Sequence, residues 1–182
     1  MSLVPKDVFF VKGVGYHRSK LGSFEEALRD ANIEKYNLVK VSSIFPPYCI
    51  EVSKEDGLAQ LRPGQIVYTV LSRASSNEYN RLVVTAIGIA KPADKNSYGY
   101  LSEHHAFGVK PEKAGNFAED LAAGMLATTL GLPFDAEADW DEKKEMYKVE
   151  GKIIETKSIT ASATVREENE WLTVLSAAIF IL

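Results

Sequence analysis

The sequence has few of the features that mark secreted, membrane-spanning or nucleic-acid-binding proteins. It contains a single cysteine, Cys49, so no disulfide can form within one chain, and a reducing cytoplasm is the expected compartment. No apolar run approaches the ~20 residues that a membrane-spanning helix needs. The first residues lack the apolar block of a secretory signal. The net charge of −4 mixes acids and bases along the 182 residues, which argues against a nucleic-acid partner.

Familiar catalytic and metal-binding patterns are equally scarce. There is no G-x-S-x-G segment, and only three histidines could serve a serine hydrolase as a base. The acidic segment 134–142 alternates carboxylates like the start of a calcium loop, but Trp140 stands where such a loop requires glycine. Glu103 and His105 could share a metal ion, yet no third ligand is evident. We therefore expect no metal site.

Two segments have the apolar spacing of helices. Ser23 and Glu26 form a capping box, which predicts a helix that begins at Ser23 and ends near Asn32. A longer helix is predicted over 112–130 and is ended by glycine and proline. Its expected apolar stripe consists of Phe117, Leu121, Met125 and Leu126.

The remaining apolar segments have the character of strands. A polar loop separates the predicted strands 65–72 and 81–90, so we expect them to form an antiparallel hairpin. The segment 51–64 between strands is polar and is predicted to be a loop. The full set of predicted strands is 8–12, 36–43, 65–72, 81–90, 98–107, 146–154, 158–165 and 171–182. One helix among strands in each half indicates an α+β fold with helices outside the sheets, either as one domain or as a compact duplicated one.

One short stretch, LVKVSSIFPP at 38–47, raises a question about its two serines. Proline cannot donate to a sheet ladder, so the strand should end near Phe45, and Ser42 and Ser43 lie close to that end. One interpretation is a serine turn that caps the strand by local hydrogen bonds. The other is that the Ser42–Ser43 peptide bond breaks itself and leaves a reactive carbonyl group.

The second interpretation gains support from a family resemblance. The segment FEEALRDANI followed by YNLVKVSSIFPP resembles the core motif of the pyruvoyl-dependent arginine decarboxylases, whose pattern is N-L-[IV]-x-[IV]-S-S-I-x-P-P. The similarity continues weakly through 85–104 and the last strand. The segment 65–81 and the acidic segment match poorly. The resemblance implies a single domain over 1–182 that cleaves itself into a β chain, 1–42, and an α chain, 43–182.

The resemblance also implies roles for individual residues. Ser43 would become the pyruvoyl cofactor after cleavage from Ser42, and Asn37 would assist that cleavage. Glu103 would be the proton donor, which suits a carboxyl in a half-buried strand. Ile44 would contact the substrate. Glu25 falls where the family usually has an aspartate that holds the substrate guanidinium, and its extra methylene could change which basic amino acid fits.

The implied whole is an enzyme that assembles from copies of itself. The family fold is a four-layer αββα sandwich, and the family forms trimers with active sites between neighbours. The implied reaction is decarboxylation of arginine to agmatine, as in polyamine metabolism or acid resistance. Two alternatives stay open: a non-catalytic relative that binds a ligand or regulates a partner, and a decarboxylase of another amino acid.

Overall fold

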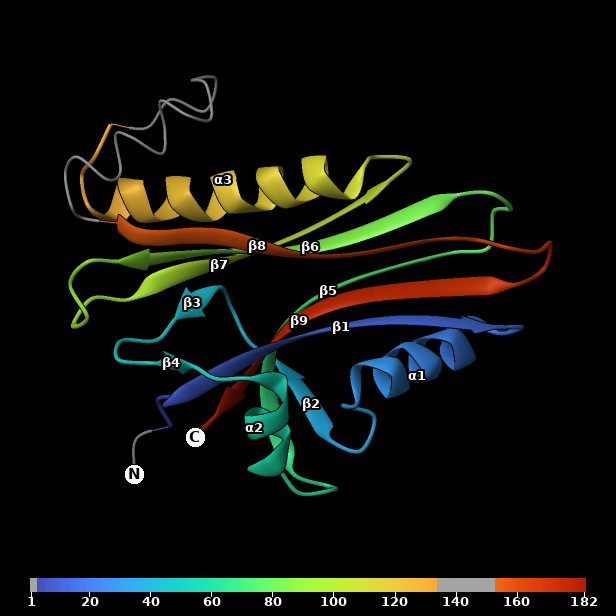
Figure 1. The fold of residues 1–182 in the computed structure, drawn as a ribbon, viewed down its shortest axis with the longest axis horizontal. Helices are drawn as coiled ribbons and strands as arrows, with labels where there is room; N and C mark the ends of the chain where they lie inside the picture. The colour runs from blue at the N-terminus through green and yellow to red at the C-terminus, as the bar shows by residue number, and fades with distance from the viewer. Residues whose placement is uncertain (1–2, 134–152) are drawn as a thin grey trace.

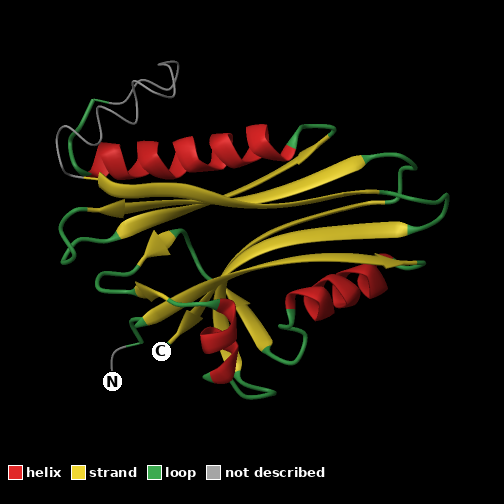
Figure 2. Cartoon of the chain, in the orientation of Figure 1, coloured by secondary structure: helices red, strands yellow, loops and turns green. Residues whose placement is uncertain are grey.

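The computed structural model describes residues 3–133 and 153–182, so the acidic segment 134–142 and most of the predicted strand 146–154 lie outside the described residues. Two sheets stack face to face, with helices on both outer sides (Figures 1 and 2). The helices are α1 (Lys20–Ala31), α2 (Lys54–Ala59) and α3 (Pro111–Thr129). The strands are β1 (Asp7–His17), β2 (Asn37–Lys40), β3 (Ile44–Phe45), β4 (Ile50–Glu51), β5 (Ile66–Ser76), β6 (Leu82–Pro92), β7 (Gly99–Phe107), β8 (Ile153–Thr164) and β9 (Trp171–Ile181). This arrangement confirms the predicted α+β sandwich.

The two sheets are mainly antiparallel. The five-stranded sheet has the order β2-β5-β9-β1-β4, and the four-stranded sheet has the order β3-β7-β6-β8. Only the short edge strands β2 and β4 run parallel to their neighbours among the described pairs. Buried apolar residues from both sheets meet between the layers, among them Val70, Ile87, Leu101 and Phe180. This central core fixes the distance at which the sheets face each other.

The predicted hairpin of 65–72 and 81–90 is wrong. These segments form β5 and β6, which belong to different sheets. β5 pairs with β2 and β9, whereas β6 pairs with β7 and β8, so each strand already has two neighbours. The polar loop therefore carries the chain from one layer to the other. Both strands are buried over most of their length, and such strands need not pair locally.

The first helix begins before the predicted capping box. Its N-cap is Ser19, whose Oγ accepts a hydrogen bond from Gly22 N at 3.1 Å. Ser23 is instead buried inside the helix, where its Oγ lies 2.7 Å from Thr173 Oγ1 of β9. The predicted end at Asn32 is confirmed, because Asn32 adopts the left-handed conformation that closes helices. Leu21 in the first turn is exposed, and the buried face of the helix consists of Ser23, Ala27 and Ala31.

The predicted apolar stripe of the second long helix is wrong for two of its four members. Phe117 and Leu121 of α3 are 53% and 43% exposed. The buried face consists mainly of Ala114, Gly115, Ala118, Ala122, Ala123, Leu126 and Ala127. Helix and sheet approach closely, since a Cβ on Gly88 of β6 would lie 2.0 Å from the Ala118 carbonyl oxygen. Small side chains, rather than large ones, therefore face the sheet.

The polar segment 51–64 contains a helix that the sequence did not reveal. α2 is capped by Ser53, whose Oγ accepts a hydrogen bond from Asp56 N at 3.1 Å. Its Gly57 packs directly on the ring of Phe9 in β1. A helix of six residues is too short to develop an apolar periodicity, so only its cap could have indicated it.

Candidate active site

The Ser42–Ser43 peptide lies where the chain crosses from one sheet to the other. Val41 continues the ladder of β2, because its N–H donates to Thr69 O of β5 at 2.9 Å. Ser43 already belongs to the opposite layer, since its carbonyl oxygen accepts a hydrogen bond from Leu101 N of β7 at 2.8 Å. We call residues 41–43 the crossover. Both ends of the crossover are held by sheet hydrogen bonds, so the peptide between the serines has a defined position.

A tight turn follows the crossover. Phe45 and Pro46 are buried, and Phe45 belongs to the core between the sheets. Tyr48 has a φ of 59°, in the left-handed region that residues other than glycine rarely adopt. Cys49 N donates to Pro46 O at 3.3 Å and closes the turn. The segment after Ser43 is therefore anchored by packing as well as by its short pairing with β7.

Glu103 is the acidic side chain that the fold brings to the crossover. It lies two residues beyond Leu101 on β7, and alternation along the strand places both on the face toward the other sheet. Its side chain is 31% exposed, and its Oε2 accepts a hydrogen bond from Lys40 Nζ of β2 at 3.0 Å. Glu103 thus joins the two sheets beside the serine pair.

A largely apolar hollow of about 400 Å³ opens next to the crossover. Ser42 and Ile44 form part of its wall, together with Tyr68 of β5 and Phe180 of β9. The N-terminal residues Leu3, Val4 and Pro5 also line it. The lining residues include no carboxylate, so the hollow of one chain suits an aliphatic stem better than a cationic end group.

Asn37 and Glu25 do not reach the crossover within one chain. Asn37 stands at the opposite end of β2 from Val41, roughly 13 Å along an extended strand at ~3.3 Å per residue. Its amide donates to Gly64 O at 2.7 Å. Glu25 lies on α1, which covers the outer face of the five-stranded sheet, and it pairs with Arg29 at 2.7 Å (Figure 1).

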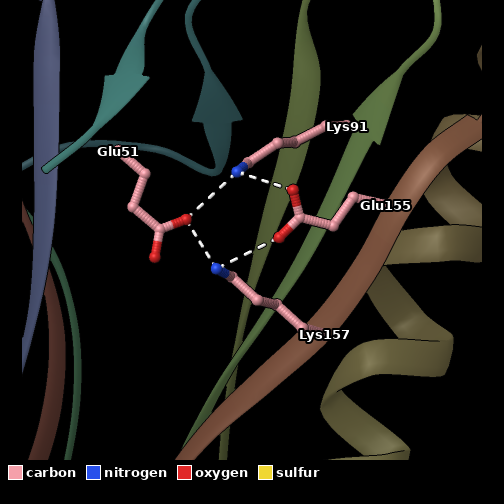
Figure 3. A network of polar contacts seen from close by, with 4 residues as sticks. All are labelled: Glu51, Lys91, Glu155 and Lys157. Carbon is pink, nitrogen blue, oxygen red and sulfur yellow. Dashed lines mark hydrogen bonds and ion pairs between the residues drawn. The ribbon is translucent and has the colours of Figure 1, made fainter.

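A network of four charged residues lies between the sheets near the turn that follows the crossover. Lys91 of β6 and Lys157 of β8 each contact both Glu51 of β4 and Glu155 of β8, at distances of 2.5–3.1 Å (Figure 3). Burial alone would raise the pKa of Glu155, but hydrogen bonds and charges from the two lysines outweigh it and leave the pKa below its ordinary value. Burial alone would lower the pKa of Lys157, yet the two glutamates raise it overall. All four side chains are paired with each other, which favours a structural role.

The two adjacent histidines of β7 point to opposite faces of the sheet. His104 faces α3, where its ring lies 4.5 Å from that of Phe117. Burial, with a smaller contribution from the charge of His105, lowers the pKa of His104. Within residues 3–133 and 153–182, no three His, Cys, Asp or Glu side chains gather in a way that could hold a metal ion.

The sequence predicted roles for the serine pair, Ile44 and Glu103, and these roles stay predictions; it did not indicate the other residues that the fold brings to the crossover. Lys40 lay inside the quoted motif, at a position where the family pattern allows any residue. Tyr68, Phe180 and the N-terminal residues come from distant parts of the chain. No local signal could have indicated that they share one hollow with Ser42.

Comparison with known proteins assigns this fold and site to a family. The family model "Pyruvoyl-dependent arginine decarboxylase" matches residues 7–182. A "Probable pyruvoyl-dependent arginine decarboxylase" of Chlorobium luteolum is 59% identical over 181 residues, which cover 100% of this chain and 99% of the relative. A relative with the same name from Chloroherpeton thalassium is 56% identical and covers 100% of both chains.

A further relative has a somewhat lower identity. "Pyruvoyl-dependent arginine decarboxylase 2" of Methanosarcina acetivorans is 51% identical over 179 residues, which cover 98% of each chain. This chain is a member of the pyruvoyl-dependent arginine decarboxylase family. A pyruvoyl group is a covalently bound cofactor that such enzymes make from one of their own serines. The crossover fits it, because Ser43 is half-buried between Ser42 and Ile44, which line the hollow, and its carbonyl oxygen is hydrogen-bonded to Leu101, two residues before Glu103 on β7.

Proposed function

We propose that this protein is a self-processing decarboxylase that converts arginine to agmatine and carbon dioxide, with a pyruvoyl cofactor made from Ser43. Family membership supports the reaction. The observation that carries the proposal is the position of the Ser42–Ser43 peptide, between two sheets and beside both a hollow and Glu103. Cleavage would give fragments 1–42 and 43–182 of a single domain.

The residue types at the crossover suit the cleavage chemistry. The Oγ of Ser43 attacks the carbonyl carbon of Ser42, the peptide C–N bond breaks, and the hydroxyl proton passes to the nitrogen. Residues 42 and 43 are then joined by an ester. Loss of the Ser43 α-proton expels the Ser42 carboxylate and leaves a dehydroalanine, and water converts this to a ketone with release of ammonia. A donor hydrogen bond to the oxyanion of the first step would accelerate it.

The hollow and Glu103 support the proposed turnover. The ketone, once formed, supplies an electron sink for loss of carbon dioxide. Ile44, Tyr68 and Phe180 present an apolar wall to the methylene stem of the substrate and exclude water from it. Glu103 would donate a proton to the carbon that the carboxylate leaves, because it is partly buried and lies two residues after Leu101, which is hydrogen-bonded to Ser43.

A second copy of the chain would complete the site. A guanidinium group calls for a carboxylate partner, and the hollow of one chain offers none among its lining residues. Glu25 lies on another layer of the same chain, as Asn37 lies at the far end of β2. Both could therefore act across an interface between copies, as in a trimer. The compartment that fits such metabolism is the cytoplasm, and none of the described helices has the length and apolarity to cross a bilayer.

Two alternative functions can be distinguished by experiment: decarboxylation of another amino acid, and ligand binding without catalysis. Glu25 in place of aspartate reaches one methylene further, and one methylene is worth ~1–3 kcal/mol in discrimination between substrates, so another basic amino acid is the alternative substrate. A non-catalytic member of the family would keep the fold and bind a ligand without cleavage.

An intact mass measurement tests the proposal. The wild-type protein should give two masses, for 1–42 and for 43–182 with a ketone at its start, in place of the 20.1 kDa chain. Ser43→Ala should remain one chain because it lacks the attacking oxygen. Ser42→Ala is the matched control and should still cleave, since Ser42 supplies only its carbonyl. An uncleaved wild-type protein would contradict the proposal, and carbon dioxide release from arginine, lysine or histidine would separate the substrates.

A further inference from the structure

Lys40 and Glu103 form an ion pair that spans the proposed cut. Lys40 precedes Ser42 by two residues and would belong to the fragment 1–42, whereas Glu103 would belong to the fragment 43–182. Their Nζ and Oε2 atoms lie 3.0 Å apart, with the lysine side chain 56% exposed and the glutamate 31% exposed. Lys40, which contacts the expected proton donor Glu103, therefore lies on the strand just before the proposed cleavage site.

The proposed cleavage changes the charge at this place. Hydrolysis of an ordinary peptide bond produces one carboxylate and one ammonium group, and the local charge balances. Conversion of Ser43 to a ketone releases its nitrogen as ammonia, so the protein keeps the new carboxylate of Ser42 without a new cation. The mature site thus gains one negative charge within two residues, or ~7 Å of extended chain, of Lys40.

Few charged groups face this edge of the two sheets. β2 contributes Lys40, β7 contributes Glu103 and, by alternation, His105, and β5 contributes the phenol of Tyr68. β6 presents the uncharged Thr85 and Ile87 opposite them. Among the described residues that face the crossover, Lys40 is the group that is cationic at neutral pH. Two carboxylates that lie close together without a cation would each hold a proton more strongly.

We propose that Lys40 is a positioning residue that serves as the counter-ion of the Ser42 carboxylate created by cleavage. This inference rests on the proposed function. In the uncut chain Lys40 holds Glu103 alone. After the cut the same ammonium group is shared between the carboxylates of Ser42 and Glu103, so its ion pair with Glu103 weakens.

Labelling with [1-¹³C]serine provides a direct measurement, because Ser42 is the one serine with a free carboxyl group after cleavage. Its carbon resonance should titrate at a pH about one unit higher in Lys40→Met than in the wild type. Lys40→Arg keeps the charge and should restore the wild-type midpoint. Lys110→Met is the matched control, since Lys110 is an exposed lysine that precedes α3, and it should leave the midpoint unchanged.

Turnover gives an independent readout. The alkaline pH at which kcat falls should move upward by about one unit in Lys40→Met, with KM changed less than threefold, and Lys40→Arg should reverse the shift. Identical midpoints in wild type and Lys40→Met would overturn the role of Lys40 while leaving the decarboxylase intact. A folded Lys40→Met chain that stays uncut would also overturn it, by placing the lysine in cleavage. A wild-type protein without the cut would instead refute the proposed function.

Discussion

Burial makes the thiol of Cys49, close to the crossover, unreactive. It lies six residues after Ser43 and closes the turn that anchors that serine. Burial and the nearby charge of Asp7 raise the pKa of its thiol to about 12. The thiol therefore stays protonated at neutral pH and is a poor nucleophile. The proposed chemistry at this position therefore depends on Ser43 and Glu103.

The role of Glu103 can be separated from the formation of the cofactor. Glu103→Gln should still cleave into two fragments, because the attacking atom belongs to Ser43. Turnover should fall by ~10²–10⁴, since glutamine keeps the size of the side chain but has no acidic proton to deliver. Intact mass and carbon dioxide release measure the two effects, and Glu112→Gln on α3 is the control. Loss of cleavage together with turnover would move Glu103 into the processing step.

The sequence could suggest the residues to which we assign the chemistry, but not their surroundings. Two serines followed by Ile44 and two prolines form a local pattern, so the resemblance could indicate them directly. The hollow is not local, because its walls come from β5, β9 and the N-terminus. The pairing of Lys40 with Glu103 depends on the approach of two sheets, which residue spacing along either strand does not encode.

At the scale of the elements, α3 and β6 depend on small side chains for their contact. Gly88 allows the carbonyl of Ala118 to approach the sheet, and alanines fill most of the buried helix face. Helical periodicity located this helix to within one residue at each end. The periodicity gave the wrong buried face, because large apolar side chains such as Phe117 and Leu121 are more hydrophobic than the alanines that contact the sheet.

Two leucines on α3 provide a test of this buried face. Leu126→Ala removes a fully buried side chain and should lower the free energy of unfolding by about 2–4 kcal/mol. Leu121→Ala is the matched substitution at a side chain that is 43% exposed, and it should cost less than about 1 kcal/mol. Urea unfolding followed by circular dichroism measures both. Equal losses would mean that Leu121 is covered in solution, as it would be at an interface between copies.

At the scale of the whole molecule, the two sheets are joined by an apolar centre and by the four-residue charge network. The network links β4 of one sheet to β6 and β8 of the other (Figure 3). The pKa of Glu155 is lowered on folding, so its contribution to stability is present above its ordinary value near ~4.5 and is lost as the pH falls through the folded value. The raised pKa of Lys157 delays the corresponding loss to strongly alkaline pH.

The pH dependence of stability should reflect this network. Between pH 7 and pH 3.5 the wild type should lose more unfolding free energy than Glu155→Gln, because the variant has no carboxylate there to protonate. The difference should be less than about 1 kcal/mol, since the four side chains are partly exposed to water. Urea unfolding at the two pH values measures it. Glu168→Gln, at an exposed position, is the control and should follow the wild type.

The order of helices and strands predicted the α+β class with helices outside the sheets, and the family resemblance implied the four-layer sandwich, whereas neither gave the assignment of strands to sheets. β5 and β6 are neighbours in sequence and carry similar apolar residues. Nothing in either segment therefore indicates that the two strands belong to different sheets. The closing strand β9 explains the outcome. It fills the place beside β5 along eight residue pairs, and it comes from the far end of the chain.

The position of β1 inside its sheet affects how the cleaved protein could refold. β1 lies between β9 and β4 and pairs with β9 along eleven residue positions. A chain severed after Ser42 would therefore keep its short piece without any covalent tie. Refolding of the uncut precursor is a first-order event, whereas the severed protein must find its missing strand by collision, at a rate that depends on concentration. Maturation would thus divide each copy of the protein into two chains that stay together without a covalent bond and reassemble slowly once they are separated.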